Sequence, residues 1–143
     1  MLSEQTKNKF QLQVVTELDC LQDVLVWFEK SVGPYLPQKV AWQCEVALAE
    51  AFTNAVRHAH QELPASTPID LEVELLPNFL EIKVWDWGQP FDLEAQLIAH
   101  EEDLNSVEKE GGRGLQFIKK LTDELQYFPC PDQRNCLVIR KKY

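Results

Sequence analysis

The stretch WQCEVALAEAFTNAVRHAH, residues 42–60, has the pattern of one long amphipathic helix. When successive residues are placed about 100° apart, apolar side chains such as Phe52 fall on one arc, which should face a core. The opposite, polar arc carries Glu50, Asn54 and His58 at intervals of four residues, so these side chains should stack one turn apart. A carboxylate, an amide and an imidazole in such a row can hold a metal-bound phosphate and a water. A solvated helix face has the same spacing, so this motif needs support from the rest of the chain.

Length and composition narrow the classes of protein to consider. The 143 residues predict one domain, 1–143, which is long enough to bury a sizeable core. A formal charge of −9 disfavours direct binding to nucleic-acid phosphates. There is no apolar run of membrane-spanning length and no signal-peptide pattern, so we expect a cytoplasmic protein without a membrane partner. The four cysteines form no C-x-x-C pair, which favours reduced thiols, and His58 and His60 point apart on the helix, which argues against zinc.

The hydrophobic pattern on either side of the long helix predicts a sheet. We expect strands at residues 9–15, 69–76, 79–85, 125–128 and 137–140. A first helix, capped by Thr16, should run to about residue 32, where Gly33 and Pro34 end it. Pro37 is well placed to open the long helix, because its missing N–H costs nothing in a first turn.

The third predicted strand runs directly into a sharp turn. The turn contains Asp86 and Gly88, and it leaves the Asp86 carboxylate at a strand edge, where ligands often bind. Trp85 and Trp87 share the opposite face of the strand end; core packing is the commonest outcome for such aromatics, with lid contacts or a partner surface as alternatives. The acidic stretch that follows has one short apolar helix pattern and is predicted to be a mobile lid at about residues 89–112.

A glycine-rich turn, GGRG at residues 111–114, then opens a helix whose apolar spacing begins at Leu115. Glycines allow close backbone approach, and the free N–H groups at a helix start attract anions. Taken alone, GGRG is a weak phosphate-binding signal, and a plain loop or a helix cap is the alternative.

In this order, the three motifs resemble those of the GHKL ATPase superfamily, and within it the RsbW-type anti-sigma factors, which are serine-protein kinases. The stretches that carry the resemblance are EAFTNAVRHAH, VWDWGQPFD and GGRGLQFIKKLTDEL, and the order of elements is compatible from about residue 9 to 142. The chain has neither a Walker motif nor the motifs of eukaryotic protein kinases. The resemblance implies an α+β fold of the Bergerat type, a two-layer sandwich with helices on one face of a mixed, mostly antiparallel sheet.

The resemblance also implies the site residues and the ligands. ATP would lie between the long helix and the lid, with Asn54 as the Mg²⁺ ligand and Glu50 as the general base that polarises the attacking hydroxyl or water. Asp86 would read adenine through its exocyclic amine, with Gly88 leaving room for the base. The implied contacts to phosphate are Arg57, His58, Gly112, Arg113, Gly114 and Leu115. One departure is the segment 135–137, Asn-Cys-Leu, which stands where relatives often have a Thr-rich segment, so a hydroxyl contact there is in doubt.

The function that the resemblance implies is a serine/threonine-protein kinase. It would phosphorylate a small antagonist of the anti-sigma factor, sequester a sigma factor and form a homodimer. A non-catalytic nucleotide-binding regulator that acts by contact alone is one alternative. A detached ATPase domain of a histidine kinase is another, although the chain has neither a candidate phospho-acceptor helix pair nor an obvious Phe-rich box in the lid.

Overall fold

The computed structural model describes residues 8–101 and 112–143. Its helices and strands follow the chain in the order β1 (Lys9–Val15), α2 (Leu21–Ser31), α3 (Gln38–Asn54), β2 (Pro68–Leu75), β3 (Phe79–Asp86), α4 (Leu93–Glu101), α5 (Gly112–Leu121), β4 (Glu124–Pro129) and β5 (Asn135–Lys142). Short 3₁₀ turns lie at Leu18–Cys20 and Gly33–Tyr35, and one π-helical turn lies at Ala55–Ala59. All five predicted strands are present, within one to two residues of their predicted bounds.

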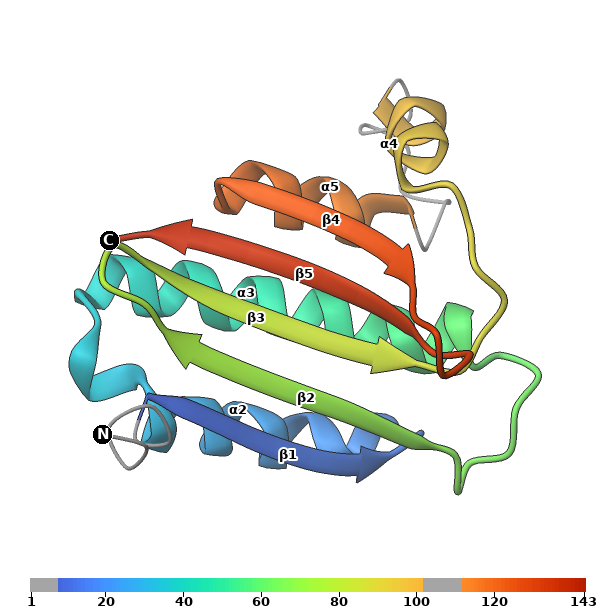
Figure 1. The fold of residues 1–143 in the computed structure, drawn as a ribbon, viewed down its shortest axis with the longest axis horizontal. Helices are drawn as coiled ribbons and strands as arrows, with labels where there is room; N and C mark the ends of the chain where they lie inside the picture. The colour runs from blue at the N-terminus through green and yellow to red at the C-terminus, as the bar shows by residue number, and fades with distance from the viewer. Residues whose placement is uncertain (1–7, 102–111) are drawn as a thin grey trace.

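The five strands form one sheet in the order β1-β2-β3-β5-β4, and every neighbouring pair is antiparallel. The α+β sandwich is therefore confirmed, but the described sheet has no parallel pair, whereas a mixed sheet was expected. The reason is the place of β5. The crossover through α4 and α5 brings β4 back in the same direction as β3, and β5 then returns between these two strands (Figure 1).

The core lies between one face of the sheet and the helices α2, α3 and α5, which lie behind the sheet in Figure 1. Strand alternation sends one set of side chains to this face, so that Ile82 of β3 and Ile139 of β5 are fully buried. Phe28 of α2 and Phe52 of α3 meet them from the helical layer and are also fully buried. The opposite face of the sheet has no helix from the described part of the chain packed against it.

The start of the first helix differs from the prediction. The Leu18–Cys20 turn has Glu17 as its N-cap residue, without a side-chain cap hydrogen bond, so the prediction that Thr16 caps this helix is wrong. The Thr16 hydroxyl instead donates a hydrogen bond to the Thr67 carbonyl and lies 2.8 Å from the His60 ring. A contact between segments far apart in the chain has replaced the local capping contact.

The two tryptophans beside Asp86 do not lie in the core, so the preferred prediction for them is wrong. Trp85 is half-buried and Trp87 is 41% exposed. Both rings pack against the guanidinium of Arg134, which lies 5.3 Å from one ring centroid and 6.0 Å from the other. Arg134 also forms an ion pair with Asp70 of β2. Strand alternation explains the placement, because Ile82 and Val84 already occupy the core face of β3.

Candidate functional site

Asp86 ends β3 with a buried and fixed carboxylate. Its Oδ1 accepts hydrogen bonds from the Gly88 backbone N–H, at 2.9 Å, and from the side-chain amide of Asn135, at 3.1 Å. The same amide nitrogen of Asn135 donates to the Gly88 carbonyl, at 2.7 Å. Neither of the two bonds to Asp86 uses Oδ2, so this oxygen is available to a further donor.

Asn135 is a site residue that the sequence pattern did not identify. It lies directly opposite Asp86 in the register of β3 and β5, and it is 2% exposed. It lies in the segment 135–137, where the sequence departs from the family resemblance. An amide group can bond two acceptors at once, and here it joins the Asp86 carboxylate to the turn that follows. Correct pairing of β5 with β3 would have revealed it.

His60 holds the same turn from the helical layer. The Trp87 backbone N–H donates to Nε2 of His60, at 2.8 Å, so this ring nitrogen carries no proton. The proton is therefore on Nδ1, which donates to the Thr16 hydroxyl, and Thr16 donates in turn to Thr67. His60 is 1% exposed, and burial lowers its pKa while the charge of Asp86 partly opposes this. The ring is thus neutral at pH 7 and ties the turn to the ends of α3 and β1.

Gly88 permits close packing at this point. A Cβ atom on Gly88 would lie 2.2 Å from the carbonyl oxygen of Ala59, in the π-helical turn. The resemblance implies that a glycine here leaves room for the base. The close approach of the Ala59 backbone is by itself a sufficient reason for a glycine at this position.

The π-helical turn changes the arrangement of side chains at the end of α3. The N–H of His60 bonds to the carbonyl of Ala55, five residues earlier, so this turn is wider than the α-helical turns before it. The predicted row of Glu50, Asn54 and His58 remains a prediction, with Glu50 and Asn54 in α3 and His58 in the π-helical turn. Arg57 and His58 both lie on the exposed side of this turn. Turns of this kind occur often at functional sites.

Glu50 and the glycine-rich helix lie together. A Cβ on Gly114 would be 3.0 Å from Oε2 of Glu50, so the lack of a side chain at Gly114 lets α5 approach α3 at this residue. The first four N–H groups of a helix have no partner within it, and in α5 they belong to residues 112–115. Leu115 is 3% exposed and packs in the core, which leaves its backbone N–H for any ligand contact. The side chain of Arg113 lies outside the described part of the structure.

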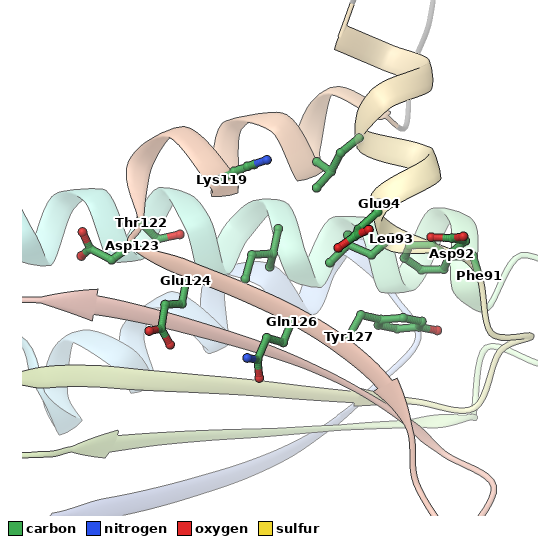
Figure 2. A pocket seen from close by; sticks show the side chains of 12 residues that line it. Phe91, Asp92, Leu93, Glu94, Lys119, Thr122, Asp123, Glu124, Gln126 and Tyr127 are labelled. Carbon is green, nitrogen blue, oxygen red and sulfur yellow. The ribbon is translucent and has the colours of Figure 1, made fainter.

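A cavity of about 490 Å³ lies between α4, α5 and β4 (Figure 2). Phe91 and Tyr127 stack in its wall, with ring centroids 4.2 Å apart and an interplanar angle of 24°. The first half of the predicted lid contains α4, which is held to α5 because the side-chain amide of Gln116 donates to the Leu97 carbonyl. The second half of the predicted lid, residues 102–111, lies outside the described residues.

Within residues 8–101 and 112–143, no three side chains of His, Cys, Asp or Glu are grouped so that they could hold a metal ion. Their helices are all too short or too polar to cross a membrane. The four cysteines are free thiols, and burial raises the pKa of both Cys44 and Cys136 to about 12.

Comparison with known proteins identifies the family. Residues 17–141 match the family model of the histidine kinase-like ATPase domain. The serine-protein kinase RsbW of Staphylococcus aureus is 34% identical over 91 residues, which are 61% of this chain and 57% of that protein. The same kinase from strain MRSA252 is 34% identical over 88 residues, or 59% of this chain and 55% of that protein. The matched part is thus little more than half the length of these relatives.

A solved structure shares the fold over the whole length. The structure of the SiaB-SiaC complex from Pseudomonas aeruginosa contains a chain that matches 99% of this one, with 95% of its own length covered and a TM-score of 0.64. The sequence identity is 14%, so this likeness concerns the fold alone. The family model, in contrast, matches the sequence itself from the turn after β1 to the end of β5. The chain belongs to the histidine kinase-like ATPase family, as its resemblance to the GHKL superfamily implied.

Proposed function

We propose that this chain is an ATP-dependent serine/threonine-protein kinase that phosphorylates a small antagonist protein. The similarity to serine-protein kinase RsbW supports the reaction class. The observation that carries the proposal is the packing of Glu50 beside Gly114, because it brings a carboxylate to the start of α5, where the first N–H groups have no partner within the helix. Phosphoryl transfer requires mainly positioning and stabilisation of charge, and these two elements supply both.

The buried end of β3 fits an adenine base. Asn135 and Gly88 hold Oδ1 of Asp86, so Oδ2 remains to accept a hydrogen bond from the exocyclic amine of adenine. Guanine has a carbonyl oxygen at that position, which a carboxylate repels. Because the carboxylate is held in one orientation before the base arrives, little conformational entropy is lost on binding.

The other end of the nucleotide fits the facing ends of α3 and α5. The N–H groups of residues 112–115 would bind phosphate oxygens, with Arg57, His58 and Arg113 as further candidate contacts. The amide oxygen of Asn54 is the ligand that this chain offers to Mg²⁺, which prefers oxygen and retains water and phosphate ligands. When bound, Mg²⁺ would neutralise charge on the phosphoryl group that is transferred.

Glu50 would act on the attacking hydroxyl. It lies one turn before Asn54 on α3, so both side chains lie toward the same end of α5. In the proposed reaction, Glu50 orients the serine or threonine hydroxyl of the antagonist and accepts its proton as the bond from oxygen to the γ-phosphorus forms and ADP leaves. The other features that we propose for this protein are a single domain, a cytoplasmic location, a homodimer and sequestration of a sigma factor.

The test is a transfer assay with paired variants of α3. The purified protein is incubated with Mg²⁺, γ-labelled ATP and a phosphatase-treated soluble extract of its source cell, and labelled proteins are identified by mass spectrometry. We expect one small protein labelled on Ser or Thr. Glu50→Gln should reduce labelling by at least about 100-fold while ATP affinity changes little, because a general base contributes about 10²- to 10⁴-fold to rate.

Glu45→Gln is the matched control, because Glu45 is on another face of α3, where burial and the charge of Glu29 raise its pKa. This variant should label the target at the normal rate. Labelling by Glu50→Gln at that same rate would refute the assignment of Glu50. ATP binding without any labelled target would favour the regulator that acts by contact alone.

A further inference from the structure

The hydroxyl of Tyr127 is buried, and none of the residues that the structure describes accepts a hydrogen bond from its O–H group. A buried O–H group without an acceptor costs free energy, so its persistence calls for a ligand or a water. The ring is held in place by its stacking on Phe91. In Figure 2 the hydroxyl points away from Gln126, toward the end of the sheet where Phe91 and Asp92 lie.

The register of the sheet brings Tyr127 to the same face as Asp86. Asn135 pairs with Asp86 on one side and with Pro129 on the other, and Tyr127 precedes Pro129 by two residues. Side chains two residues apart on a strand point to the same face of the sheet, so Tyr127 and Asp86 both point toward the helical layer. The charge of Asp86 contributes to the raised pKa of Tyr127, after the larger effect of burial, while the Phe91 backbone N–H lowers it slightly. The hydroxyl therefore keeps its proton and is a donor.

The hydrogen bonds at the end of β3 determine which polar atoms of an adenine base would still lack a protein partner. Adenine presents a donor, the 6-amino group, and beside it an acceptor, ring N1. Asp86 supplies an acceptor through Oδ2. Among the described residues, the two donors that hold the Asp86 carboxylate are already used, because the Gly88 N–H bonds Asp86 and the Asn135 amide bonds both Asp86 and the Gly88 carbonyl.

We propose that Tyr127 is a specificity-determining residue of the base pocket, whose hydroxyl donates a hydrogen bond to ring N1 of adenine. This inference rests on the proposed ATP site and adds a second contact to it. Asp86 and Tyr127 together form an acceptor-donor pair, which is complementary to the edge of adenine. Guanine presents the reverse order, with a carbonyl oxygen at position 6 and a proton on N1, so it would leave both protein groups unpaired.

The test compares Tyr127→Phe with the unsubstituted protein, using calorimetric titration with ATP and with 1-deaza-ATP, in which N1 is replaced by a C–H group. Phenylalanine retains the ring that stacks on Phe91 and removes only the hydroxyl. We expect the variant to bind ATP about 10-fold more weakly, a typical effect of losing one hydrogen bond. The unsubstituted protein should lose the same factor toward 1-deaza-ATP, and the variant should bind the two nucleotides equally.

Tyr35→Phe is the control, because Tyr35 is 67% exposed at the far end of α3 and should bind ATP normally. The inference is overturned if Tyr127→Phe binds ATP with unchanged affinity, or if its loss is the same for both nucleotides as a general structural change would cause. Absence of ATP binding by the folded, unsubstituted protein would overturn the proposed function and this inference together. The two failures are thus distinguished in one experiment.

Discussion

Replacement of Gly88 by alanine should destabilise the fold at the site itself. The new Cβ would lie 2.2 Å from the Ala59 carbonyl oxygen and 2.8 Å from its carbonyl carbon, whereas ordinary contacts begin at 3.4 Å. The turn or the π-helical segment must therefore move by about 1 Å, since both contacts are with backbone atoms. Such overpacking costs about 1–3 kcal/mol. The movement also weakens hydrogen bonds to Gly88 and Trp87, each worth about 1 kcal/mol net.

We therefore expect Gly88→Ala to lower the free energy of unfolding by about 3 kcal/mol and the midpoint of thermal unfolding by roughly 10 °C. Urea titration monitored by tryptophan fluorescence measures this change, because Trp85 and Trp87 flank the turn. Gly33→Ala is the matched control. Its Cβ would meet only the flexible Glu29 side chain, at 3.3 Å, so it should remain within about 1 kcal/mol of the original protein. Equal stability of the two variants would refute the reasoning from close packing.

Three further outcomes follow from the hydrogen bonds and burial of other side chains. Burial lowers the pKa of His60 below its ordinary value of 6.5. Below pH 6.5 the unfolded chain therefore binds more protons than the folded protein, and stability falls as the pH falls. His60 should thus cost the protein up to about 1.4 kcal/mol of stability at pH 5.5 relative to pH 7.5. Urea titrations at both pH values should show a smaller loss in His60→Gln but an unchanged loss in the exposed-site control His58→Gln; equal losses in all three proteins would contradict the buried neutral ring. Iodoacetamide should label Cys44 and Cys136 far more slowly than the other two cysteines, because both thiols are buried with a pKa of about 12, and mass spectrometry of the native protein would detect an opposite order. Arg134→Ala should lower the free energy of unfolding by about 1 kcal/mol and change tryptophan emission, since it removes an ion pair and the contacts with both indole rings; an unaltered spectrum would argue against that packing.

Local patterns in the sequence were sufficient to predict most of the secondary structure. The alternation in residues 9–15 and the apolar stripe of the long helix reflect periodicity that burial on one face imposes. The order of strands was not predicted, because nothing local indicates that β5 returns between β3 and β4. The mixed sheet was expected from the family resemblance and not from any local pattern, and the described strands pair only antiparallel.

The missed parts of the candidate site depend on contacts between distant segments. Asn135 acquires its role from the register of β5 against β3, and His60 acquires its role from a bond to a backbone N–H that is 27 residues away. The π-helical turn that presents His60 replaces the regular end predicted for α3. Thr16 shows the converse error, since a residue with good capping chemistry is used for a tertiary hydrogen bond instead. Tertiary contacts of this kind override local preferences.

The most direct test of the central claim is nucleotide binding at Asp86. Calorimetric titration with Mg²⁺-ATP and Mg²⁺-GTP would be made on the original protein and on Asp86→Asn, with circular dichroism as the control for folding. We expect the original protein to bind ATP at least about 10-fold more tightly than GTP, and the variant to lose ATP affinity selectively. A folded protein that binds neither nucleotide, or a variant that retains full ATP affinity, would overturn the proposed ATP site.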